Sequence, residues 1–125
     1  MKAYVAMPFR FKEEAARWYQ ELEAIGYEIT YKWATSEGNK TDDELSHEMA
    51  QHFAIKDYEG VIDADLFIIF PKDESVCGAL IELGIAIAQR WKHREIYIVD
   101  PYRYSIFWEF GKVVTEQELR KELCI

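Results

Sequence analysis

Residues 65–70, with the sequence DLFIIF, decide the fold that we predict for this chain. Every residue after Asp65 in this run is apolar, so the strand that it predicts would be buried on both faces. Strands of this kind are typical of parallel sheets that lie between two layers of helices. Residues 2–7 (KAYVAM) and 95–99 (EIYIV) are two more apolar runs of strand length. We therefore expect an α/β fold with a mostly parallel sheet.

Helical patterns and a further strand lie around these runs. One apolar face recurs at helical spacing through Ala15, Trp18, Tyr19, Leu22 and Ile25, and Gly26 is a natural stop for that helix. Residues 28–33 (EITYKW) alternate as a strand, and the polar residues 34–40 predict a loop. Another helix is expected over about residues 76–91, after the central strand.

Two capping boxes predict where the remaining helices begin. Thr41 with Glu44, and Thr115 with Glu118, each place a carboxylate three residues after a hydroxyl. In such a pair each side chain satisfies the other residue's free backbone N–H. The first pair predicts a helix from Thr41 to about Gly60, and the second predicts a terminal helix.

The order of elements predicts where a ligand would bind. With a short fifth strand at 112–114, the order is β-α-β-α-β-α-β-β-α, a single domain over residues 1–125 with helices on both faces of the sheet. Ligands of such folds bind beyond the carboxyl ends of the strands. The loops at that edge are predicted at residues 7–11, 32–40 and 71–78.

Composition narrows the classes of function. The formal net charge of -8 disfavours binding along nucleic acid polymers, although small anions can bind where basic groups or helix N-termini converge. The cysteines, Cys77 and Cys124, are too few for a disulfide scaffold, which favours a reducing compartment. The chain shows neither a signal peptide nor an apolar run long enough to span a membrane, so we expect a cytoplasmic protein.

Known cofactor and metal motifs are missing from the sequence. It holds neither a dinucleotide-binding glycine fingerprint nor a phosphate-binding P-loop motif. His47, Glu48 and His52 do not match the zinc-protease motif, because the second histidine comes one residue too late. We therefore expect no cofactor and no metal.

Glu82 is the first candidate for chemistry. It lies in the apolar segment 77–88 (CGALIELGIAIA), where a carboxylate must face either solvent or a cleft, because unpaired burial costs several kcal/mol. Gly78 and Gly84 flank it, although glycine costs about 1 kcal/mol inside a helix. They favour close approach of a backbone or a ligand. The alternative is a solvent-facing glutamate on an amphipathic helix.

Other candidates are ambiguous when each is taken alone. Asp57 is predicted near the C-terminal end of a helix, where the dipole disfavours a negative charge, but it could be a surface carboxylate. Pro8 and Arg10 follow the first strand, and Arg10 could bind a phosphate through two hydrogen bonds or be solvated. Tyr4, inside that strand, predicts core packing.

In chain order, these residues resemble one enzyme family. Tyr4, residues 57–65 (DYEGVIDAD) and residues 78–86 (GALIELGIA) resemble the nucleoside 2-deoxyribosyltransferases and their relatives, the 2'-deoxynucleoside 5'-phosphate N-hydrolases. The resemblance runs from Tyr4 to about Phe107. It implies a flavodoxin-like three-layer fold with 4–5 strands. It also implies cleavage or transfer of the N-glycosidic bond of a (deoxy)nucleoside or nucleoside 5'-monophosphate.

The resemblance also implies roles for single residues. Glu82 matches the nucleophile that attacks C1' of the sugar, and Asp57 matches the acidic residue that assists proton transfer at the base. Tyr4 matches the tyrosine that positions the nucleophile. Arg10 falls where the phosphate hydrolases have an arginine. Ser105 falls where a neighbouring subunit lends a phosphate-binding serine.

The sequence departs from the family at the expected 5' contact of the substrate. Six residues before the nucleophile, transferases carry Asp and phosphate hydrolases carry Ser, whereas here Val76 stands beside Ser75. Lys32 occupies a position that is often polar or acidic in relatives, and it could meet a phosphate. The predicted substrate-binding residues are Pro8, Arg10, Lys32, Ser75, Gly78 and Ser105.

Alternatives to a nucleosidase remain open at this point. These departures allow a non-catalytic nucleotide-binding or sensing module on the same fold, and an enzyme that cleaves NAD-like dinucleotides is a third hypothesis. The family implies a homodimer or a higher homo-oligomer. Five aromatic residues between 102 and 110 favour an exposed apolar patch for that contact, unless they cover the domain's own core.

Overall fold

The computed structural model describes residues 1–36, 45–89 and 91–125, and it confirms the α/β fold. Its sheet consists of β1 (Lys2–Ala6), β2 (Glu28–Ile29), β3 (Leu66–Ile69), β4 (Glu95–Val99) and β5 (Lys112–Val114). The order is β2-β1-β3-β4-β5, and all neighbouring strands described are parallel. This is the strand order of flavodoxin-like folds.

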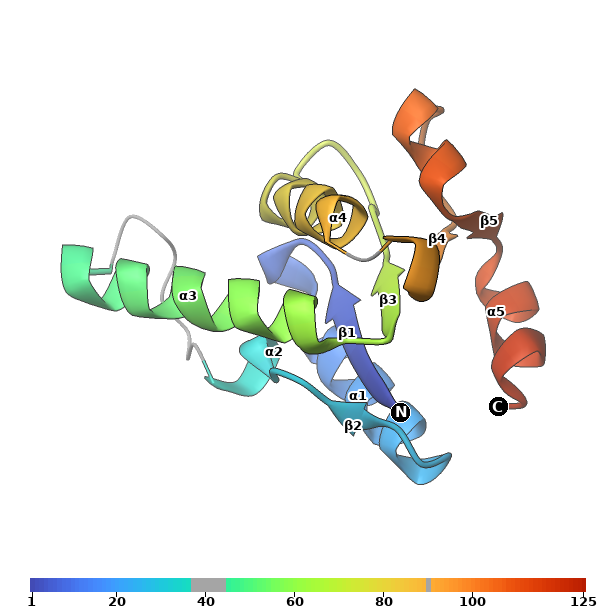
Figure 1. Ribbon diagram of the computed structural model, residues 1–125, viewed down its shortest axis with the longest axis horizontal. Coiled ribbons are helices and arrows are strands. Elements are labelled where there is room, and N and C mark those ends of the chain that lie inside the picture. Colours follow the sequence, from blue (N-terminus) through green and yellow to red (C-terminus); the bar gives the residue numbers. More distant parts are fainter. Residues whose placement is uncertain (37–44, 90) are drawn as a thin grey trace.

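Helices cover both faces of the sheet and form three layers (Figure 1). On one face, α1 (Lys12–Ala24) contacts β1 and β2, and α5 (Glu116–Leu123) contacts β4 and β5. On the other, α3 (His47–Asp63) packs against α4 (Gly78–Ala88). The short helical segments are η1 (Phe9–Phe11), α2 (Trp33–Ser36), η3 (Trp91–His93) and η4 (Ile106–Phe110).

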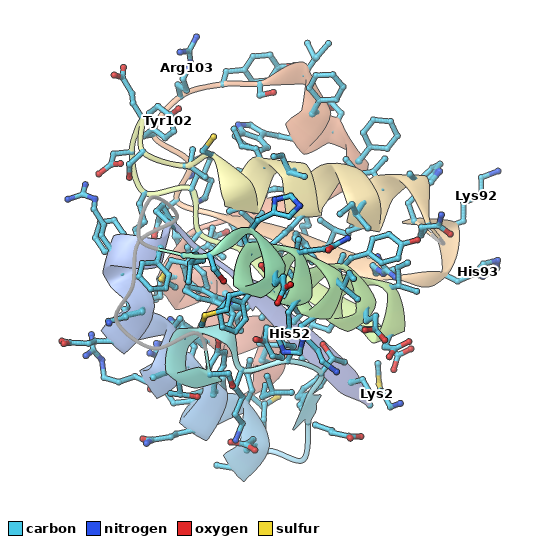
Figure 2. The ribbon with its side chains drawn as sticks, turned by 90° about the vertical axis from the view of Figure 1, so that its left-hand side faces the viewer. Lys2, His52, Lys92, His93, Tyr102 and Arg103 are labelled. Carbon is cyan, nitrogen blue, oxygen red and sulfur yellow. The ribbon has the colours of Figure 1, made fainter. Side chains whose placement is uncertain are left out.

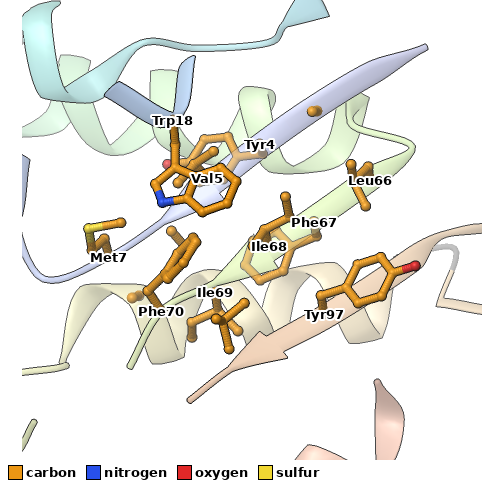
Figure 3. Packing of buried hydrophobic residues seen from close by; sticks show 14 of the residues in the cluster. Tyr4, Val5, Met7, Trp18, Leu66, Phe67, Ile68, Ile69, Phe70 and Tyr97 are labelled. Carbon is orange, nitrogen blue, oxygen red and sulfur yellow. The ribbon is translucent and has the colours of Figure 1, made fainter. Parts of the chain in front are cut away.

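The core lies around β1 and β3, which are paired in register (Figure 3). Tyr4 and Phe67 are partners in that register, and their rings stack with centroids 5.9 Å apart. Leu66, Ile68 and Ile69 are fully buried beside them. Because cores of this kind are close-packed, the ring of Tyr4 has a fixed place in the sheet.

A buried arginine joins the two helices on the face of α3 and α4. Arg94 is only 7% exposed, and its guanidinium donates to the carbonyl oxygens of Ile62 at 2.9 Å, Ala64 at 3.0 Å and Ala86 at 3.1 Å. The first two carbonyls lie at the end of α3 and the third lies near the end of α4. Carbonyls at helix ends lack partners within the helix, so Arg94 satisfies both ends at once.

The predicted second strand is largely wrong. Of residues 28–33, only Glu28–Ile29 form a strand, and Trp33 begins α2. The Trp33 indole donates to the carbonyl of Val5 at 2.6 Å, and the backbone N–H of Ala34 donates to the hydroxyl of Tyr19 at 3.2 Å. These contacts hold residues 33–34 against β1 and α1. The chain therefore leaves the edge of the sheet instead of continuing as a strand.

Helix boundaries also differ from the prediction. Thr41 and Glu44 lie outside the described residues, whereas α3 as described begins at His47, with Ser46 accepting a hydrogen bond from Met49 N. It continues past Gly60 to Asp63. The segment predicted as a helix over 76–91 forms the shorter α4, whose bounds are given above.

Several local signals are confirmed. Gly26 follows α1 with φ +100°, a conformation that favours glycine, and both hydrogen bonds of the capping box at Thr115 and Glu118 are present. Ile25, predicted on the buried face of α1, follows the last helical turn and is 39% exposed. Among the described helices, none combines the length and the apolar character needed to cross a membrane.

Candidate active site

A cleft of about 370 Å³ opens at the carboxyl end of the sheet. Segments after β1, β2 and β3 and the helices α3 and α4 contribute to its lining. Its polar lining consists of Asp57, Tyr58, Ser75, Cys77 and Glu82. The cleft therefore lies at the edge where the order of the strands predicted a ligand.

Glu82 is held at this cleft by a tyrosine from the centre of the sheet. Tyr4 is fully buried, and its hydroxyl donates a hydrogen bond from β1 to Oε2 of Glu82 on α4. Burial raises the pKa of Tyr4 well above its usual value, and the carboxylates of Glu82 and Asp57 raise it further. Tyr4 therefore keeps its proton at neutral pH and acts as the donor that orients the carboxylate.

Asp57 brings a second carboxylate to the same cleft from the opposite helix. It lies in the C-terminal half of α3, somewhat further from the end of the helix than predicted, and it is half-buried. Its charge acts on Tyr4, as does that of Glu82. The structure thus brings the three predicted catalytic residues, Tyr4, Asp57 and Glu82, into one electrostatic neighbourhood.

Gly60 is the glycine that permits close approach near the site. A Cβ atom at Gly60 would lie 2.8 Å from the Cβ of Tyr31 and 3.1 Å from the nearest ring atom of Tyr4. At Gly78 and Gly84 a Cβ atom would meet nothing within 4 Å, so no backbone approaches closely there, and the other expectation, close approach of a ligand, stays a prediction. Gly78 lines the cleft, whereas Gly84 is exposed on the outer side of α4.

Arg10 lies at the rim of the cleft, next to two other loop residues. Pro8 and Ser75 line the cleft, and Arg10 donates from Nε to Oγ of Ser75 at 3.3 Å. The Arg10 guanidinium forms an ion pair with the carboxylate of Asp73 and lies 4.6 Å from the ring centroid of Phe11. The Arg10 side chain is 61% exposed.

Two predicted substrate-binding residues lie away from the cleft lining. The chain turns into α2 directly after Lys32, whose Nζ pairs with Glu23 of α1 at 2.9 Å, and a contact between Lys32 and a phosphate stays a prediction. Ser105 caps η4 and accepts a hydrogen bond from Phe107 N at 3.2 Å. Val76, at the position of the expected 5' contact, is buried in the core.

The apolar walls of the cleft were not predicted from the sequence. They include Met7, Phe9, Trp33, Ile81 and Ile85. The rings of Phe9 and Trp33 lie with centroids 6.2 Å apart. Met7, Phe9 and Trp33 lie within segments predicted at the ligand edge, residues 7–11 and 32–40, and that placement is the signal that could have identified them. Ile81 is 65% exposed although it lies on an apolar helix.

The aromatic run after β4 divides between core and surface. Trp108 is buried, and its indole donates to the carbonyl of Arg103 at 2.9 Å. Tyr104 and Phe107 are 67% and 56% exposed. Figure 2 shows Tyr102 and Arg103 near one end of α4 and Lys92 and His93 near the other. The cleft residues Gly78 and Ala79 begin α4, at the end near Tyr102 and Arg103. The run therefore contains a core residue and several exposed aromatic residues, and contact of the latter with a partner subunit stays a prediction.

A metal centre has no clear place in this arrangement. Within residues 1–36, 45–89 and 91–125, no group of three or more His, Cys, Asp or Glu side chains could hold a metal ion. Cys77 and Cys124 are both exposed free thiols, and Cys77 is at the cleft. The polar groups that the described residues bring to the cleft are thus the carboxylates of Asp57 and Glu82, the hydroxyls of Tyr58 and Ser75 and the thiol of Cys77.

Comparisons with known proteins support the fold. No protein-family model matches the chain, and no curated protein matches it. A solved structure of a CMP N-glycosidase, BcmB of Clostridium botulinum, superposes with a TM-score of 0.65 over 100% of both chains. The two sequences are 19% identical, so this likeness concerns the fold.

Proposed function

We propose that this protein cleaves the N-glycosidic bond of a (deoxy)nucleoside or nucleoside 5'-monophosphate, with Glu82 as the nucleophile. The observation that carries the proposal is the hydrogen bond from buried Tyr4 to Glu82 in a cleft that Asp57 also lines. A fold shared with a CMP N-glycosidase adds support. Glu82 thus acts as a positioned carboxylate rather than as a surface residue of α4.

Glu82 acts at the sugar. When the bond between C1' and the base nitrogen breaks, its electron pair leaves with the base, and C1' becomes cation-like. A carboxylate below C1' stabilises that charge and can form a covalent bond to it. Since Tyr4 donates to Oε2, the other oxygen of Glu82 is the one that approaches C1'.

Asp57 acts at the leaving base. In its protonated form it gives a proton to the base nitrogen that has taken the bonding electrons. As a carboxylate it then takes a proton from the water that attacks C1', and Glu82 is released. If a second base attacks in place of water, the same residues produce transfer, so the proposal covers both a hydrolase and a deoxyribosyltransferase.

The apolar walls of the cleft suit a nucleobase. Phe9 and Trp33 present aromatic surface, and an aromatic base packs well against such rings. The Trp33 indole N–H is already bound to the carbonyl of Val5, which holds the ring in place. The base would thus lie on this wall, with its sugar directed toward Glu82.

Chromatography of reaction products tests the proposal. Purified protein is incubated with a panel of nucleosides and their 5'-monophosphates, and free base is quantified. We expect base release that falls at least about 100-fold in Glu82→Gln. The matched control is Glu59→Gln, on the exposed surface of α3, which should keep full activity. Undiminished activity in Glu82→Gln would refute the role of Glu82. Nucleotide binding without base release would favour the non-catalytic module instead.

We also infer that the protein acts as a homodimer or a higher homo-oligomer in the cytoplasm. Exposed apolar side chains gather on α4 and η4, including Ile81, Ile106 and Phe107. Exposed apolar side chains are typical of subunit contacts, and Ser105 directly precedes η4, so a contact through η4 would involve it. The exposed thiols of Cys77 and Cys124 suit a reducing compartment. Sedimentation as a monomer at micromolar concentration would contradict the oligomer.

A further inference from the structure

The two carboxylates of the proposed reaction reach the cleft from different helices, so their spacing depends on how α3 and α4 are placed. Asp57 lies on α3 and Glu82 lies on α4, and both residues line the cleft. One carboxylate acts at C1' and the other acts at the leaving base, so the spacing between them has to match the substrate. Misplacement of a reacting group by about 1 Å costs about 100-fold in rate.

Tyr4 fixes one of these carboxylates from the sheet. Its ring is fully buried in β1, and its hydroxyl donates to Oε2 of Glu82. This hydrogen bond sets the place of Glu82 relative to the sheet. The place of Asp57 depends on α3, which packs against α4. A contact that joins α3 to α4 therefore bears on the spacing of the two carboxylates.

Arg94 makes such a contact, and it does so close to both carboxylates along the helices. Its guanidinium donates to the carbonyl oxygens of Ile62 on α3 at 2.9 Å and Ala86 on α4 at 3.1 Å. Ile62 follows Asp57 by five residues. Ala86 follows Glu82 by four residues. At a rise of about 1.5 Å per residue, the two bound carbonyls lie only about 7.5 Å and about 6 Å along the helix axes from the residues that carry the carboxylates.

The buried guanidinium can hold this arrangement in a fixed geometry. Arg94 is 7% exposed, and its Nε also donates to the carbonyl of Ala64, directly after α3, at 3.0 Å. The donating nitrogens belong to one rigid plane, whereas a lysine carries its donors on a single nitrogen at the end of a flexible stem. The backbone N–H of Glu95 donates to the carbonyl of Asp65 at 2.9 Å, which ties the start of β4, directly after Arg94, to the residue before β3.

We infer that Arg94 is a positioning residue for the proposed reaction and that it sets the place of Asp57 relative to Glu82. The inference rests on the proposed N-glycosidase function and adds a residue that lies outside the cleft lining. Because Tyr4 holds Glu82 from the sheet, the loss of Arg94 acts mainly on Asp57. It therefore impairs protonation of the leaving base more than attack at C1'.

Two substrates with different leaving groups test the inference. A nucleoside that the wild-type protein cleaves needs a proton on its departing base, whereas the 4-nitrophenyl β-glycoside of the same sugar releases a phenolate that needs none. Attack at C1' is common to both substrates. In Arg94→Lys, kcat for the nucleoside should fall at least about tenfold further than kcat for the nitrophenyl glycoside, a factor that corresponds to a displacement of about 0.5 Å. Since one preparation gives both values, a reduced folded fraction cancels from their ratio.

Control variants separate positioning from stability. Leu119→Ala removes a fully buried side chain of α5, on the other face of the sheet from α3 and α4, so it destabilises the protein and should leave the ratio unaltered. Tyr4→Phe removes the contact to Glu82 and should lower both kcat values by a similar factor. Arg94→Gln, which keeps one amide donor, is measured beside Arg94→Lys and replaces it if the lysine variant does not fold. A ratio in the Arg94 variants equal to that in Leu119→Ala would overturn the inference.

A structural measurement keeps the inference apart from the proposed function. Crystal structures of the wild-type protein and of the Arg94 variant give the separation of the Asp57 and Glu82 carboxylates directly. We expect this separation to differ by about 0.5 Å or more, while the hydrogen bond between Tyr4 and Glu82 stays in place. An unaltered separation would overturn the inference whether or not base is released. If the wild-type protein releases neither base nor nitrophenolate, the proposed function fails, and the separation alone decides whether Arg94 places the two carboxylates.

Discussion

Replacing Gly60 with alanine tests how the sheet positions the nucleophile. A Cβ atom there would lie 2.8 Å from the Cβ of Tyr31, whereas ordinary contact begins at 3.4 Å, so the two atoms must separate by about 0.6 Å. Both atoms are attached directly to backbone, so α3 itself must move. The ring of Tyr4, at 3.1 Å, must also shift by a few tenths of an ångström. That ring carries the hydroxyl that donates to Glu82.

The expected magnitudes follow from these displacements. Overpacking costs about 1–3 kcal/mol, and the helix gains about 1 kcal/mol when alanine replaces glycine, so Gly60→Ala should lower the free energy of unfolding by about 1 kcal/mol. Misplacement of a catalytic group by about 1 Å costs about 100-fold in rate, so a shift of a few tenths should lower kcat by about five- to tenfold. Urea unfolding and base-release kinetics measure the two effects.

A second glycine on α4 provides the control. A Cβ atom at Gly84 meets nothing within 4 Å, so Gly84→Ala should stabilise the protein by up to about 1 kcal/mol and leave kcat unaltered. If Gly60 acts through Tyr4, the kcat effect of Gly60→Ala should shrink to less than about twofold in a Tyr4→Phe background. A Gly60→Ala protein with wild-type kcat, or with higher stability than Gly84→Ala, would refute this reasoning.

Three further predictions concern other parts of the molecule. Because burial and two carboxylates raise the pKa of Tyr4, the folded state keeps a proton that the unfolded chain loses above the ordinary pKa of 10.0. The free energy of unfolding should therefore fall as the pH rises past that value. Urea titrations at alkaline pH should show a smaller fall for Tyr4→Phe. Arg94→Met leaves three helix-end carbonyls without this donor and should cost about 3 kcal/mol or more in urea unfolding, whereas Lys92→Met should cost little. Thr115→Ala removes a capping box and should lower Tm by about 4 °C in a thermal scan, a drop that Thr35→Ala should not reproduce.

Much of the fold could be predicted because its signals are local. The apolar run after Asp65 forms the buried β3, and Gly26 and Thr115 adopt the conformations that their types favour. The predicted second strand, residues 28–33, is longer than β2 because the alternating pattern of the sequence continues into Trp33. That residue is instead held by the carbonyl of Val5, a contact between distant parts of the chain that no local pattern contains.

The site was predictable in its charged residues and less so in its geometry. The family resemblance identified the candidates by their order in the chain: Tyr4, Asp57 and Glu82. Taken alone, each of them is equally consistent with an ordinary core or surface position. Their surroundings depend on tertiary contacts: Lys32 turns toward α1, and close approach occurs at Gly60 rather than beside Glu82. Whether a cation points into a cleft or pairs outside it cannot be deduced from its position in a sequence.

Arg94 has a consequence for how the two halves of the cleft can move. It joins the ends of α3 and α4 that lie away from the ligand edge, while Asp57 and Glu82 lie closer to that edge. The Arg94 guanidinium therefore fixes α3 and α4 to each other at the ends far from the ligand edge. A change in the angle between the two helices would displace residues least near Arg94 and more with distance from it, so it would act mainly on the separation of the Asp57 and Glu82 carboxylates.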